Sequence, residues 1–199
     1  MIQYPSGHGP KPSSPNNLNQ RIRYGNRGMS LEEMLNQSNT YYLQRNLAVI
    51  HKKPTPIQVV KVDYPRRSAA RITEAYYRRA STTDYNGVYQ GKYIDFEAKE
   101  TNHLRFPLAN LPEHQVQHMQ QCVKQGGIIF LLVFFKQVNE VYLLPFVTAY
   151  DFIKNTQRKS IPYDFFHENG YLCPISYNPP IDYLKAVDDW LASGTSSEN

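Results

Sequence analysis

Three side chains have the chemical types and the spacing that hydrolysis of a phosphodiester bond requires. Twelve residues separate Asp84 from Glu97, and Lys99 follows Glu97 two positions later. Residues two positions apart in a β-strand point to one face, so Glu97 and Lys99 are expected side by side. Carboxylates on neighbouring strands can share a hard cation, and the ammonium can orient or deprotonate a water. These residues predict a metal-dependent nuclease.

Short β-strands are expected to position these side chains. Residues 81–85, 88–90 and 93–99 favour consecutive strands of a meander, with a turn at Asn86-Gly87. Asp95 falls on the same face as Glu97. A solvated strand charge is the main expectation for Asp95, and a supporting role beside the site is the alternative.

Helices and further strands complete the expected framework. Ser30-Leu-Glu-Glu33 matches a capping box that starts a helix over 31–46. A helix over 112–125, an apolar strand over 128–135 and a strand over 141–146 follow, and an irregular remainder ends in a helix over 181–192. This order predicts an α/β fold with a central mixed β-sheet flanked by helices.

The length of 199 residues favours a single domain over 30–199. Residues 1–29 are rich in Pro, Ser, Asn, Gly and Arg, a composition typical of a flexible basic arm. Two β-prone stretches around the basic residues 64–71 predict that an insertion over about 54–77 projects as a stalk.

Positive charge is concentrated in two segments of a chain whose net charge is +5. Residues 1–30 contain four bases and no acid, and residues 44–79 contain nine bases and two acids. This segregation favours a polyanion-binding surface over an ordinary solvated face. Cys122 and Cys173 lack metal-type spacing, as in a reduced cytosolic protein, and no apolar run is long enough to cross a bilayer.

Two histidines, His114 and His118, stand four positions apart on the second predicted helix. This spacing can bind zinc, but no third ligand follows in the sequence. Ordinary polar helix positions are therefore expected.

The order of elements around Glu97-Ala-Lys99 resembles the PD-(D/E)xK nuclease core, with Thr83-Asp84 in place of Pro-Asp. Further motifs narrow the resemblance to the RecU family, the Holliday junction resolvases of low-GC Gram-positive bacteria. They are Arg27-Gly-Met-Ser-Leu-Glu-Glu33, the basic insertion near 54–80, Ser81-Thr-Thr-Asp84-Tyr, Ile94-Asp-Phe-Glu97-Ala-Lys99-Glu-Thr and Leu111-Pro-Glu-His114-Gln115.

The resemblance implies roles for the residues of the site. Thr82 and Thr83 flank the Asp motif and are expected to contact either the phosphate or a metal-bound water. Either Glu32 or Glu33 can be an additional acid, and Glu32 is preferred because Glu33 belongs to the capping box. The implied catalytic set is Asp84, Glu97, Lys99, Gln115, Thr82, Thr83 and Glu32, and the implied ligands of Mg²⁺, or alternatively Mn²⁺, are Asp84, Glu97, Thr82 and Gln115.

The stalk and the arm are expected to bind DNA. Tyr64, Tyr76 and Tyr77 either stack on bases or pack across the strands. The candidate DNA-binding bases are Lys61, Arg66, Arg67, Arg71, Arg78 and Arg79 in and after the stalk, and Arg21, Arg23 and Arg27 in the arm.

The resemblance implies a cytoplasmic, nucleoid-associated endonuclease that makes paired symmetric cuts in four-way DNA junctions during recombination and repair. A homodimer would supply the two cuts, and RecA and a branch-migration complex are implied partners. The competing hypothesis is a DNA-binding recombination modulator that anneals strands without cutting them. The two carboxylates separate these hypotheses, because only a nuclease needs Asp84 and Glu97.

Overall fold

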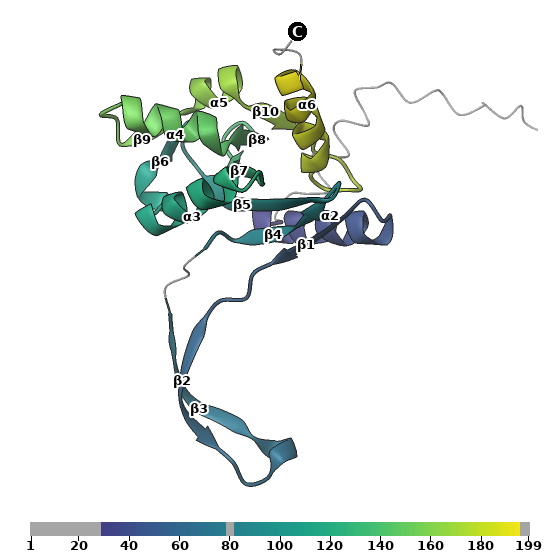
Figure 1. The fold of residues 1–199 in the computed structure, drawn as a ribbon, viewed down its shortest axis with the longest axis vertical. Coiled ribbons are helices and arrows are strands. Elements are labelled where there is room, and N and C mark those ends of the chain that lie inside the picture. Colours follow the sequence, from purple (N-terminus) through teal and green to yellow (C-terminus); the bar gives the residue numbers. More distant parts are fainter. Residues whose placement is uncertain (1–28, 79–81, 196–199) are drawn as a thin grey trace, which may run out of the picture.

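A mixed six-stranded β-sheet forms the centre of the computed structural model, which describes residues 29–78 and 82–195 (Figure 1). The strand order is β1-β4-β5-β7-β8-β10, and β5 and β7 run parallel whereas the other neighbours run antiparallel. The strands are β1 (Ala48–Lys52), β4 (Tyr85–Tyr89), β5 (Lys92–Thr101), β7 (Ile128–Phe135), β8 (Glu140–Pro145) and β10 (Tyr171–Cys173).

Helices cover both faces of this sheet. On one face, α2 (Leu31–Gln44) and α6 (Tyr183–Thr195) pack in one hydrophobic cluster. On the other face, α3 (Glu113–Lys124), α4 (Phe146–Asn155) and α5 (Tyr163–Asn169) pack in a second cluster. The even residues of β7, such as Phe130, enter the first cluster and the odd residues, such as Leu131, enter the second. A strand covered on both faces has to be apolar throughout, which explains the sequence of β7.

Several expected elements are found close to their predicted bounds. The strand predicted over 128–135 is β7, and the capping box of Ser30 and Glu33 starts α2. The α/β class with a mixed sheet between helices is therefore confirmed. The expectation of an irregular segment before the last helix is wrong, because α4 and α5 lie there. Pro145 and Pro162 are the N-caps of these helices, so these prolines mark helix starts.

The turn predicted at Asn86-Gly87 is also misplaced, because both residues lie inside β4. A Cβ on Gly87 would stand 1.9 Å from the carbonyl oxygen of Val49, so the glycine permits close approach of β1. The hairpin turns instead at Gln90 and Gly91, whose φ angles of 48° and 73° suit a tight two-residue turn.

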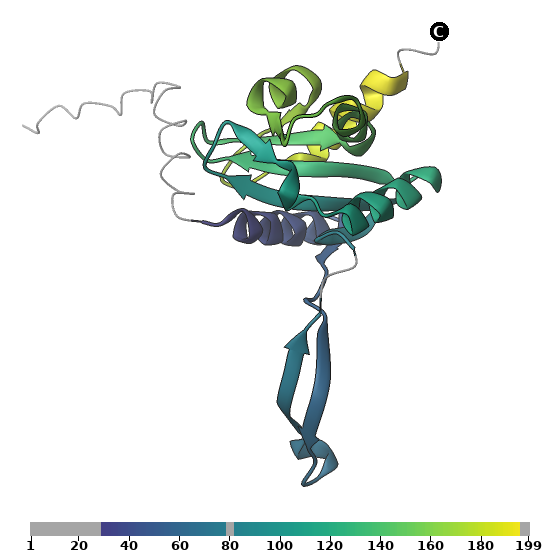
Figure 2. The same ribbon diagram turned by 90° about the vertical axis from the view of Figure 1, so that its left-hand side faces the viewer.

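A two-stranded antiparallel stalk projects from the body, as both views show (Figures 1 and 2). It consists of β2 (Ile57–Asp63) and β3 (Arg71–Tyr77), joined across the short helix η1 (Arg67–Ala69). Every residue of both strands is exposed. The remaining elements, β6 (Arg105–Pro107), η2 (Leu108–Asn110) and β9 (Ser160–Pro162), include a small two-stranded sheet of β6 and β9.

Candidate active site

The structure brings Asp84, Glu97 and Lys99 together where β4 meets β5. Asp84 immediately precedes β4, and the first residue of β4, Tyr85, pairs with Phe96 of β5. The backbone N–H of Asp84 donates to Oε2 of Glu97 at 3.1 Å. The ammonium of Lys99 lies 3.1 Å from Oδ2 of Asp84 and forms an ion pair with Oε1 of Glu97. One amine therefore contacts both acids.

Burial and neighbouring charges set the protonation states of Glu97 and Lys99. Desolvation, followed by the charge of Asp84, raises the pKa of Glu97 from its ordinary 4.5 to about 7. Burial lowers the pKa of Lys99, but the charges of Glu97 and Asp84 outweigh it and hold that pKa above its ordinary value. Lys99 therefore remains a cation at neutral pH.

One oxygen in this region is left for a cation. Among the described residues, Oε1 of Gln115 is a buried side-chain oxygen without a hydrogen-bond donor, whereas Oε1 of Glu97 is paired with the ammonium of Lys99. Gln115 lies near the start of α3, and its Nε2 donates to the carbonyl oxygen of Thr82 at 3.2 Å, which directs the donor end of the amide to the backbone. Hard divalent ions take carboxylate and amide oxygens as ligands. The residues present therefore fit a divalent ion.

The two threonines before Asp84 differ in their surroundings. Thr82 is half-buried and supplies the carbonyl oxygen that accepts from Gln115. Thr83 is 2% exposed, and its hydroxyl donates to Asp95 while it accepts from Nζ of Lys53 at 2.9 Å. These contacts do not favour the expected contact between the Thr83 hydroxyl and a phosphate.

A pocket of about 460 Å³ opens beside Asp84 and Lys99. Glu32 lines this pocket and pairs with Lys52 at 2.5 Å, whereas Glu33 is held by Ser30 in the capping box. Of the two acids, Glu32 is therefore the one that faces the site. Sequence reasoning missed Glu100, which also lines the pocket and accepts from the backbone N–H of Leu31 at 3.3 Å, although its position directly after Lys99 was a usable signal.

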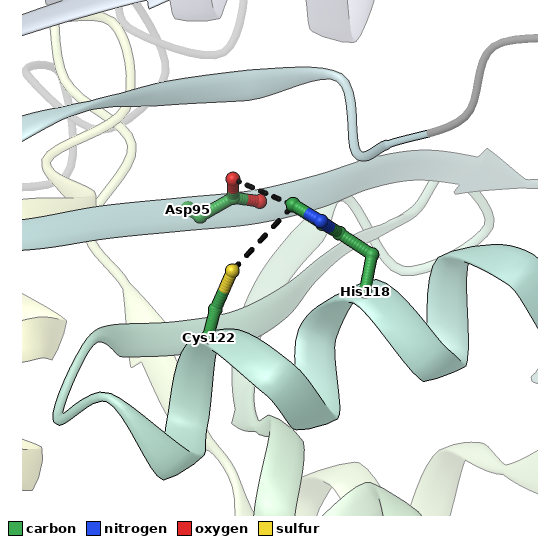
Figure 3. Close-up of side chains that lie close together, drawn as sticks. All are labelled: Asp95, His118 and Cys122. Carbon is green, nitrogen blue, oxygen red and sulfur yellow. Dashed lines mark hydrogen bonds and ion pairs between the residues drawn. The ribbon is translucent and has the colours of Figure 1, made fainter.

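The expectation that Asp95 is a solvated strand charge is wrong, because this side chain is 0% exposed. Its Oδ2 lies 3.2 Å from Nε2 of His118, which in turn lies 3.6 Å from the sulfur of Cys122 (Figure 3). These three residues offer donor types that bind metals. Sequence spacing could not pair His118 with Asp95, because Asp95 comes from another element, β5. Lys53, which pairs with Asp95 at 2.8 Å, was missed as well.

Comparison with known proteins assigns the family. The family model described as Recombination protein U, RecU, matches residues 26–189. The chain belongs to the RecU family. A Holliday junction resolvase RecU of Pediococcus pentosaceus is 55% identical over 195 residues, which cover 94% of this chain and 96% of the relative. One from Staphylococcus aureus is 57% identical over 171 residues, which cover 84% of this chain and 82% of the relative.

A solved structure, the Holliday junction resolvase Hjc of Archaeoglobus fulgidus, aligns with a TM-score of 0.41 and 11% identity. The alignment covers 64% of this RecU-family chain and 84% of Hjc.

The stalk of this RecU-family chain displays its bases and tyrosines to solvent. Tyr64, Tyr76 and Tyr77 are 64%, 62% and 84% exposed, which favours availability to a partner over packing across the strands. Arg78, at the base of the stalk, donates through Nε to Gln58 at 3.1 Å. The exposed candidate bases are Lys61, Arg66, Arg71 and Arg78, Arg67 belongs to η1, and Arg21, Arg23, Arg27 and Arg79 lie outside the described residues.

Within the described parts of the chain, the search for membrane spans finds no helix with the length and apolar character needed to cross a bilayer.

Proposed function

We propose that this protein is a Holliday junction resolvase, an endonuclease that places paired symmetric cuts in four-way DNA junctions. Membership of the RecU family and the names of two relatives at more than half identity support this function. The observation that carries it is the contact of one partly buried amine, Lys99, with two carboxylates from neighbouring segments, Asp84 and Glu97. A DNA-binding protein that does not cut has no use for this arrangement.

Asp84, Glu97 and Gln115 would hold Mg²⁺, or alternatively Mn²⁺, with Thr82 beside them. When bound, the ion neutralises phosphate charge and activates a water for attack. Lys99 keeps its proton, because the two acids raise its pKa, and it therefore offers positive charge to the phosphate where negative charge develops in the transition state. Of the two roles expected for Lys99, orienting the water fits this charge better than deprotonating it.

The stalk would engage the junction itself. Exposed Arg66 and Arg71 supply phosphate contacts, and the exposed rings of Tyr64 and Tyr77 supply surfaces on which unpaired bases can stack. Such contacts recognise the shape of the junction and not its sequence. A homodimer would place one site at each of two symmetric strands.

In the cell, the protein would act in the cytoplasm at the nucleoid, where recombination intermediates form. RecA and the branch-migration machinery would be its partners in recombination and repair. Strand annealing without cleavage remains the competing function, and the same basic surfaces would serve it.

Cleavage of a labelled mobile four-way junction tests the proposal. With Mg²⁺ the protein should produce paired symmetric nicks, and with EDTA it should bind the junction without cutting it. Asp84→Asn should abolish cleavage and retain binding. Asp189→Asn is the control, because Asp189 is an exposed acid that pairs with Lys185 on α6. Unchanged cutting by Asp84→Asn would remove the nuclease assignment.

A further inference from the structure

Asp95 is contacted by four polar side chains, of which one lies on its own strand, two lie in the segments beside β1 and β4, and one lies on α3. Its carboxylate accepts from Nζ of Lys53 at 2.8 Å, from the hydroxyl of Tyr93 at 2.5 Å and from the hydroxyl of Thr83, and Nε2 of His118 lies 3.2 Å away. Burial raises the pKa of Asp95, but the hydrogen bonds, led by that of Lys53, lower it below its ordinary value. Asp95 is thus a buried carboxylate whose charge the protein stabilises.

The donor types of Asp95, His118 and Cys122 raise the question of a zinc site (Figure 3). Oδ2, the oxygen that faces His118, is the oxygen that the ammonium of Lys53 and the hydroxyl of Tyr93 also contact. A metal ion bound there would have to displace the three polar groups that already contact this oxygen, whereas Oε1 of Gln115 has no hydrogen-bond donor to displace. The contacts therefore favour a hydrogen-bonded network over an ion site.

This network is joined directly to the candidate active site. Thr83, held by Asp95 and Lys53, immediately precedes Asp84 in the chain. The backbone N–H of Lys53 donates to the carbonyl oxygen of Asp84 at 2.8 Å. Asp95 itself stands two positions before Glu97 on β5. The Asp95–Lys53 pair therefore fixes the backbone of Asp84 relative to the strand that carries Glu97.

The same pair lies at the base of the stalk. Lys53 follows the last residue of β1 and begins the segment that leads to β2. Lys53 and Asp84 line a pocket of about 290 Å³ together with Arg78, which follows β3. The position of Lys53 thus links the stalk to the loop that bears Asp84.

We propose that Lys53 and Asp95 are a positioning pair for cleavage. The pair holds Asp84 in place beside Glu97 and connects this arrangement to the base of the stalk. The inference rests on the proposed nuclease function. Neither residue has to touch DNA or a metal in this role. Loss of partners that orient the ligands of a metal site typically costs about 10- to 100-fold in affinity or activity.

The test compares Lys53→Met, Asp95→Asn and the double variant with wild type in the full-length protein. Each is measured for kcat and KM on a four-way junction, for binding of Mn²⁺ without DNA by electron paramagnetic resonance, and for thermal unfolding. The matched control replaces another ion pair, Lys185 and Asp189 of α6, by Met and Asn.

We expect each single variant and the double variant to lower kcat about 10- to 100-fold, to weaken Mn²⁺ binding about tenfold and to leave KM unchanged. The effects of the two single substitutions should not add, because the residues act through each other. Lys53→Arg, which keeps the charge, should recover part of the lost kcat. The control pair should match wild type in kcat and in Mn²⁺ affinity.

A folded double variant with wild-type kcat and Mn²⁺ affinity would overturn the inference, and so would a raised KM at unchanged kcat. If the double variant does not fold, Thr83→Val decides, since it removes only the hydroxyl that joins the pair to the loop, and a normal kcat then overturns the inference. A wild-type protein that cuts no junction would instead overturn the proposed function, which keeps the two failures distinct.

Discussion

Replacing Glu97 by glutamine is expected to stabilise the metal-free protein while it abolishes cleavage. The side chain of Glu97 is 0% exposed, and burial together with the charge of Asp84 raises its pKa to about 7. The charged form is therefore less favourable in the fold than in water, even with Lys99 beside it. Glutamine keeps the shape and removes the charge.

The pKa gives the size of this effect. Because the folded pKa of Glu97 lies above its ordinary value of 4.5, the folded state holds more protons between about pH 4.5 and 7. The free energy of unfolding of the wild type therefore falls as the pH rises through this range. The difference corresponds to about 3 kcal/mol above pH 8. Glu97→Gln should recover this amount at high pH and gain almost nothing below pH 4.5.

Urea unfolding in EDTA at a series of pH values measures the difference directly. Glu168→Gln is the control, because Glu168 is an exposed carboxylate on α5, away from the site, and it should stay within about 0.5 kcal/mol of wild type. Added Mn²⁺ should stabilise the wild type more than Glu97→Gln, and the advantage should grow from pH 6 to 8 as Glu97 loses its proton. A Glu97→Gln protein that is less stable than wild type at pH 8, or a difference that does not change with pH, would refute the reasoning.

Three further substitutions test other parts of the molecule. Lys99→Met should lower kcat on a junction about 100-fold or more at unchanged junction affinity, and weaker binding in a gel-shift titration would contradict a role in the transition state. Arg71→Ala should weaken binding of junctions more than binding of linear duplex, and it should reduce the salt dependence of the junction affinity by about one phosphate contact. Equal losses of affinity for both DNAs would contradict a role of the stalk in recognising the junction. Phe96→Ala should lower the free energy of unfolding by about 3–5 kcal/mol in urea, because Phe96 stacks on Tyr85 and Phe130 in the core, and a loss below about 1 kcal/mol would contradict that packing.

Residues whose role is set by local pattern could be placed from the sequence. The capping box at Ser30 and Glu33 and the apolar run of β7 depend on neighbours in the chain, so their bounds were predictable. The Asn86-Gly87 pair was misassigned as a turn. Gly87 is needed because β1 packs too close for a Cβ atom, and this contact joins segments far apart in the chain. The prolines before α4 and α5 were not recognised as helix starts, because the sequence alone does not distinguish a proline that begins a helix from one that interrupts regular structure.

Some residues of the candidate site could likewise be predicted from local spacing, and others could not. The spacing of Asp84, Glu97 and Lys99 was sufficient to predict their convergence, because adjacent strands and alternating side chains fix it. The surroundings of Asp95 were not predictable, since burial depends on α3 and on the segment at Lys53. No local signal separates Lys53 from the other bases of its segment.

The stalk leaves and re-enters the sheet at neighbouring positions, which has a consequence for how the protein can vary. Lys52, the last residue of β1, is paired directly with Tyr85, the first residue of β4, so the sheet would be closed equally well by a short hairpin turn. Residues can be added or removed in the projection without shifting any strand of the body. The length of the stalk can therefore vary while the geometry of Asp84, Glu97 and Lys99 in the body stays the same.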